Sequence, residues 1–160
     1  MRGLVVLVVA ACAREPAVRP ATAPVAPPST TPLPALGTPA EVQTHAGVYD
    51  GYEVDDACRD VGARGVRGLG AHEMPPIVGD GRDFDLWATA LQRDTEQTLG
   101  PLVLGVGFGI GCRDEDRGFR VYVRRFGEID AVIEALGRFI RDRELGVRFL
   151  IVPSPRIVPL

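Results

Sequence analysis

The sequence predicts an α+β domain, a small antiparallel sheet with two helices on one face, preceded by a disordered stalk. Apolar residues recur at helical spacing over 83–99 and again over 128–145, which predicts two helices. Apolar residues alternate with other residues over 102–112 and 119–123, which predicts strands. With a last strand over 147–152, the order from residue 83 is α-β-β-α-β. Placing both helices on one face of the sheet buries their apolar sides.

The first predicted helix has a start, an apolar side and a stop. Asp83 is a suitable N-cap, because its carboxylate can accept a free N–H group of the first turn. Gly100 and Pro101 end the helix, since glycine favours the position after a helix and proline cannot continue one. The residues on the apolar side are Phe84, Trp87, Ala88, Leu91 and Thr95.

From residue 105 onward, the strand over 102–112 has glycine at every position of one side. Side chains alternate along a strand, so the apolar residues and the glycines lie on opposite faces. Glycine inside a strand often marks the close approach of a ligand or of another backbone. The apolar side is Leu104, Val106, Phe108, Ile110 and Cys112, and the other side is Gly105, Gly107, Gly109 and Gly111. A charged turn leads to the strand over 119–123, which predicts a hairpin.

Residues 128–145 have the clearest helical pattern. Glu134 and Arg138 lie at the i,i+4 spacing of a favourable ion pair. Gly146 suits the end of this helix, and Pro153 ends the strand that follows. The apolar stripe is Ile129, Val132, Ile133, Leu136, Phe139 and Ile140.

We expect three regions along the chain: a signal peptide over 1–11, a lipidated cysteine and proline-rich linker over 12–40, and one domain over 41–160. A chain of 160 residues usually holds one domain. Glycines are frequent over 41–80, and the apolar residues there recur at neither helical nor strand spacing. This part is therefore predicted to be irregular, with a loop over 61–70.

The linker contains eight prolines over 13–40. Proline fixes φ and removes a hydrogen-bond donor, so this segment is predicted to form neither helix nor sheet. We expect an extended, semi-rigid spacer with a reach of about 80 Å, at ~3.1 Å per residue.

The N-terminus predicts an export signal. Arg2 supplies a positive charge, and the apolar run over 4–11 is far shorter than the ~20 residues of a membrane-spanning helix. Val9-Ala10-Ala11-Cys12 resembles the lipobox of bacterial lipoproteins: an aliphatic residue, two small residues and a cysteine. The resemblance implies a diacylglyceryl group on the Cys12 thiol, cleavage before Cys12 and acylation of the new N-terminus.

The predicted location follows from this anchor. The protein is expected on the cell membrane or outer membrane, held by lipid, with its domain facing the periplasm or the exterior. Two alternatives remain open at this point: a signal that is cleaved with a chance cysteine, and a cytoplasmic protein whose first strand is buried.

Cys58 and Cys112 are the other two cysteines. An even pair in an exported chain predicts a disulfide, because the compartments outside the cytoplasm are oxidising. The bridge closes about 54 residues and is expected to stabilise the domain by roughly 4 kcal/mol in the chain-entropy model. The alternative is a pair of buried free thiols.

One face of the predicted sheet is a candidate binding face. It combines the glycine row with cationic and aromatic residues of the neighbouring strands, and a flat cationic surface can receive acidic or backbone groups of a partner. The alternatives are a solvated face and a face covered by residues 41–80. The candidate residues are Gly105, Gly107, Gly109, Arg120, Tyr122, Arg124 and Arg148.

The remaining motifs predict no catalytic, metal or cofactor site. The net charge of −3 argues against a nucleic-acid partner. The glycine row lacks the third glycine of the dinucleotide motif, because Ile110 or Cys112 stands at that place. Asp80, Asp83 and Asp85 lack the spacing of a calcium loop, and His72 has no second histidine at zinc-site spacing. We therefore predict a binding protein rather than an enzyme.

Residues 86–152 resemble the helix–strand–strand–helix–strand modules in the pro-regions of secreted bacterial serine proteases. The resemblance rests on Leu99-Gly100, the strand over 103–111, Phe119–Val123, the helix over 128–145 and the strand over 147–152. Such modules act as folding catalysts and inhibitors that dock a sheet on the protease. Two functions are thus expected: a lipid-anchored envelope protein that binds a protein or envelope component, or a stand-alone pro-domain-like inhibitor or folding helper.

Overall fold

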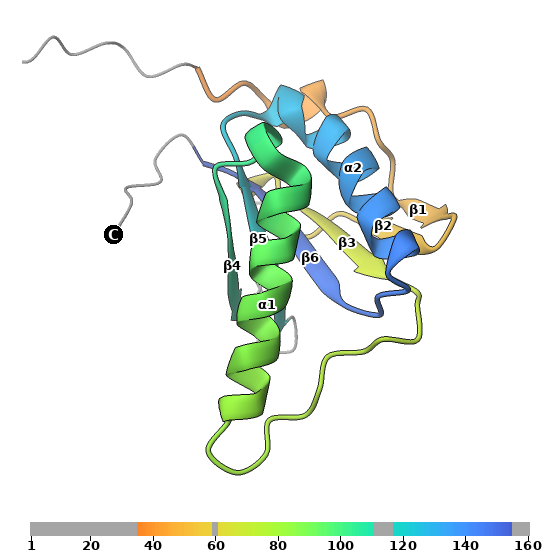
Figure 1. Cartoon of the computed structure of the whole chain (residues 1–160). Helices are drawn as coiled ribbons and strands as arrows, with labels where there is room; N and C mark the ends of the chain where they lie inside the picture. The colour runs from red at the N-terminus through yellow and green to blue at the C-terminus, as the bar shows by residue number, and fades with distance from the viewer. Residues whose placement is uncertain (1–34, 59–60, 111–116, 155–160) are drawn as a thin grey trace, which may run out of the picture. The chain divides into compact units, whose positions relative to one another are not determined.

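The computed structural model describes residues 35–58, 61–110 and 117–154. The predicted signal peptide, Cys12, most of the linker and Cys112 lie outside these residues. Two α-helices are described, α1 (Arg82–Leu99) and α2 (Ile129–Asp142) (Figure 1). The described strands are β1 (Gly47–Tyr49), β2 (Tyr52–Asp55), β3 (Arg64–Gly68), β4 (Gly105–Ile110), β5 (Arg117–Val123) and β6 (Arg148–Pro153).

The α+β class and the order α-β-β-α-β from α1 onward are confirmed. Asp83 is not the N-cap of α1, however. Gly81 occupies that position in a left-handed conformation (φ 76°). Asp83 lies in the first turn, where its negative charge interacts favourably with the positive end of the helix dipole. The side chain of Asp80 supplies a hydrogen bond at the start of the helix instead, since its Oδ1 accepts the backbone N–H of Arg82 (3.2 Å).

The prediction of a small, wholly antiparallel sheet is wrong. The described strands form one six-stranded mixed sheet in the order β1-β2-β3-β6-β5-β4. β5 and β6 are parallel, whereas the other neighbouring pairs are antiparallel. The reason is that α2 follows β5 and precedes β6 in the sequence. The helix carries the chain back to the end of the sheet where β5 began, as a connection between parallel strands requires.

The prediction that residues 41–80 are irregular is also wrong, because β1, β2 and β3 lie there. β3 occupies the middle half of the predicted loop over 61–70 and is an internal strand between β2 and β6. Its glycines are required by close packing. A Cβ on Gly68 would lie 2.0 Å from the carbonyl oxygen of Leu145, and a Cβ on Gly65 would lie 2.1 Å from Oδ1 of Asp55.

Both helices cover the same face of the sheet (Figure 1). Phe108, Phe119 and Phe149 lie opposite one another across β4, β5 and β6. Phe84 of α1 contacts Phe108 (ring centroids 5.1 Å apart), and Phe139 of α2 contacts Phe149 (6.4 Å). This row of aromatic rings ties the two helices to the three strands, and Phe119 at its centre is completely buried. The opposite side of β4, β5 and β6 is called the outer face below.

Candidate functional site: the outer face of the sheet

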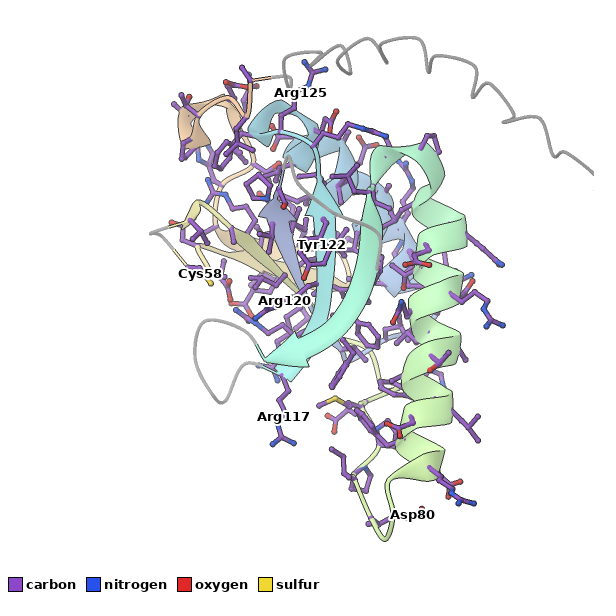
Figure 2. The ribbon with its side chains drawn as sticks, turned by 90° about the vertical axis from the view of Figure 1, so that its left-hand side faces the viewer. Cys58, Asp80, Arg117, Arg120, Tyr122 and Arg125 are labelled. Atoms are coloured by element: carbon purple, nitrogen blue, oxygen red, sulfur yellow. The ribbon has the colours of Figure 1, made fainter. Side chains whose placement is uncertain are left out.

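The strand register brings most of the predicted binding residues together. Gly105 lies opposite Tyr122, Gly107 opposite Arg120, and Gly109 opposite Gly118. All alternate with residues that face the helices, so they share the outer face. Figure 2 shows Arg120 and Tyr122 on the side of the sheet away from α1.

The glycine row makes room for side chains of the next strand. A Cβ on Gly107 would lie 3.9 Å from Cε2 of Tyr122, and a Cβ on Gly109 would lie 3.6 Å from Nε of Arg120. The phenol ring and the guanidinium therefore lean over β4 and are half-buried there. The aromatic ring of Tyr122 can stack on a partner, and its hydroxyl can form a hydrogen bond with it.

Two predicted residues have other partners. Arg148 forms an ion pair with Asp55 of β2 (Nη1–Oδ2 2.8 Å), which balances its charge. Arg124 follows the end of β5, where its Nη1 donates to the carbonyl oxygen of Pro101 (3.1 Å). The cationic character of the outer face is consequently smaller than the sequence predicts.

Part of the outer face is covered from within the domain. Ala57 and Ala63 lie in the connection from β2 to β3 and are buried against Leu150 of β6. Cys58 and Val152 pack against the same cluster. The alternative of a cover by residues 41–80 thus holds over β6, while Tyr122 and Arg120 lie on the neighbouring strand β5. Figure 2 shows Cys58 on the same side of the sheet as these two residues.

The disulfide stays a prediction, because Cys112 lies outside the described residues. We expect the intact exported protein to react with no thiol probe until it is denatured and reduced, and then to react at Cys58 and Cys112. Counting labelled cysteines by mass spectrometry checks this. Two cysteines labelled without reductant would exclude the bridge.

Three aspartates in β2 or next to it form ion pairs. Asp50 pairs with Arg141 (3.0 Å), Asp55 with Arg148, and Asp56 with Arg64. The pair of Asp56 and Arg64 lines a cavity of about 240 Å³, together with Pro39, Gly62 and Ala63. The sequence showed no sign of this cavity, because its walls come from separate segments.

Asp130 at the start of α2 holds a segment that lies far away in the sequence. Its Oδ2 accepts the backbone N–H of Gln43 (2.8 Å), and its Oδ1 accepts the backbone N–H (2.9 Å) and the hydroxyl (2.6 Å) of Thr44. Burial raises the pKa of Asp130, but these bonds and the charge of Arg64 outweigh it and lower the pKa below the usual 3.8. The ionised carboxylate of Asp130 therefore stabilises the folded domain fully above pH ~4, and this stabilisation is lost as the pH falls through the lowered pKa.

Within the described ranges, no group of three or more histidine, cysteine or acidic residues is placed to hold a metal ion. Neither described helix has the length and hydrophobicity needed to cross a bilayer. No protein-family model, curated protein or solved structure matches the chain.

Proposed function

We propose that this chain is a lipid-anchored protein of the cell envelope whose domain binds another envelope protein through the outer face. The anchor is the diacylglyceryl group that the lipobox-like residues 9–12 imply. The proline-rich linker holds the domain away from the membrane, where it can reach a partner.

The observation that supports this proposal most is the unequal covering of the sheet by the described residues: the helices cover one face, whereas the described cover of the outer face lies over β6. α1 and α2 bury one face, while the outer face presents the half-buried Tyr122 ring beside a row of glycines. Tyrosine is enriched among the residues that dominate protein–protein binding, and glycine lets a partner approach the backbone closely.

Replacing Tyr122 by alanine tests the proposal. We expect the Tyr122→Ala protein to recover at least tenfold less partner than the wild type, because truncating a dominant aromatic contact typically costs ~2 kcal/mol or more. The measurement is quantitative mass spectrometry of partners cross-linked to the full-length protein in its own envelope.

Tyr49→Ala is the matched control. Tyr49 is also a partly exposed tyrosine, but it lies on β1, the opposite edge of the sheet from β4. Partner recovery should be unchanged in this variant, and circular dichroism should show both variants folded. Equal recovery by Tyr122→Ala and wild type would contradict the proposal.

A second function deserves a test because the order α-β-β-α-β and the one-sided helix layer are present. In a stand-alone pro-domain-like inhibitor or folding helper, the outer face docks on a secreted serine protease. The purified protein would then inhibit a co-secreted protease or speed its refolding. If neither effect is seen with any co-secreted serine protease, this function is excluded.

A further inference from the structure

The chain that leads into the domain runs across the N-terminal end of α2 before it joins the sheet. We call residues 36–44 the strap. It contains one 3₁₀ turn, Pro39–Glu41, and reaches β1 through His45 and Ala46. Val42 is 9% exposed and packs into the core, together with the half-buried Leu36.

Few hydrogen bonds fasten the strap to the rest of the described domain. At its start, the backbone N–H of Phe126 donates to the carbonyl oxygen of Leu36 (3.0 Å). At its end, the three bonds to Asp130 hold Gln43 and Thr44. Among the described residues, the other backbone hydrogen bonds of the strap are local, such as the one from the N–H of Val42 to the carbonyl oxygen of Pro39 (3.2 Å). Asp130 is thus the main polar attachment of the strap.

The strap is not a strand of the sheet. β1 begins at Gly47 and pairs with β2 independently of it. Detaching residues 36–44 would therefore break the bonds to Phe126 and Asp130 and expose Val42, while every strand pair of the sheet keeps its hydrogen bonds. Segments with few attachments open at lower free energy than the core of a domain.

We propose that residues 36–44 form a releasable strap and that the hydrogen bonds to Asp130 hold this strap closed. Opening of the strap lengthens the tether between the anchor and the domain. This inference rests on the proposed tethering at Cys12. While the strap is closed, the linker leaves the domain beside the N-terminus of α2. When it opens, the nine residues of the strap are released from the domain and add up to about 30 Å to the reach of the tether.

Cleavage by a glutamate-specific protease tests the strap in the full-length protein. Glu41 is the only glutamate between Glu15 and Glu53, and it lies in the 3₁₀ turn of the strap. We expect Asp130→Ala to raise the rate of cleavage after Glu41 about tenfold or more, because hydrogen bonds to a charged group are the stronger ones. Thr44→Val, which removes only the hydroxyl bond, should give a smaller increase.

Glu134→Ala is the matched control. Glu134 is also an acidic residue on α2, but it pairs with Arg138 on the exposed side of the helix (2.6 Å). Cleavage after Glu41 should be unchanged in this variant.

Amide hydrogen exchange separates strap opening from general destabilisation. In Asp130→Ala, the amides of Gln43 and Thr44 should exchange about tenfold or more faster, while those of Val121 and Ile151 in the central strands stay as in the wild type. Unchanged exchange at Gln43 and Thr44, or equal acceleration at all four amides, would overturn the proposal. Neither measurement needs the lipid, so failure of the strap is distinguishable from failure of the anchor.

Discussion

Replacing Cys12 by serine is expected to move the full-length protein from the membrane pellet to the soluble fraction of the envelope. The serine hydroxyl cannot receive the diacylglyceryl group that the lipobox resemblance implies. Several acyl chains together hold a protein stably on a bilayer, whereas a protein without them has only its surface to bind with. Fractionation followed by immunoblotting measures the shift, and we expect it to be nearly complete.

Cys58→Ser is the control for this experiment. It also removes one thiol, but within the folded domain and beside Ala57 and Leu150. This variant should stay in the pellet, even if it is less stable than the wild type. A Cys12→Ser protein that remained in the pellet would contradict the anchor.

The second large effect is expected at Gly68. A Cβ there would lie 2.0 Å from the backbone oxygen of Leu145, at a buried position where neither β3 nor the segment after α2 can move easily. Overpacking of this kind typically costs 1–3 kcal/mol and occasionally more, and the contact is with backbone rather than a flexible side chain. We therefore expect Gly68→Ala to lower the free energy of unfolding by about 3 kcal/mol in urea titration.

Two other glycines provide matched controls. A Cβ on Gly107 would meet Tyr122 at an ordinary 3.9 Å, and a Cβ on Gly47 would meet nothing within 4 Å. Gly107→Ala and Gly47→Ala should each change the free energy of unfolding by less than ~1 kcal/mol. If Gly68→Ala were as stable as these controls, the close packing of β3 against the α2–β6 connection would be wrong.

The contrast among these glycines explains why β3 was missed. From sequence, a glycine that permits a tight backbone contact cannot be distinguished from one that marks a loop. Gly68 and Gly65 are constrained by Leu145 and Asp55, and Leu145 lies 77 residues away in the chain. The two helices could be predicted because their signal is local: one apolar stripe at helical spacing.

The parallel pairing of β5 and β6 did leave a signal. A helix between two predicted strands is the usual connection of a parallel pair, whereas a tight turn joins an antiparallel one. The helical pattern of α2 between Val123 and Val147 was therefore enough to question a wholly antiparallel sheet. The number of strands was not predictable in this way, because β1, β2 and β3 are short or rich in glycine.

Only the part of the candidate site that follows from the alternation of side chains along a strand could be predicted. Alternation places Gly107, Arg120 and Tyr122 on one face, and the register confirms it. The ion pair of Arg148 with Asp55 depends on which strands become neighbours, which alternation does not reveal. Asp130 was missed for the same reason, since its partners Gln43 and Thr44 lie in a segment that shows no periodic pattern.

The most direct test of the tethered binding protein is the mass of its mature N-terminal peptide. The protein should be purified from its own envelope in detergent, cleaved, and analysed by mass spectrometry. We expect the first residue to be Cys12, with the added mass of a diacylglyceryl group on its sulfur. A peptide that begins at Met1, or a Cys12 with an unmodified thiol, would contradict the anchor and the tether together.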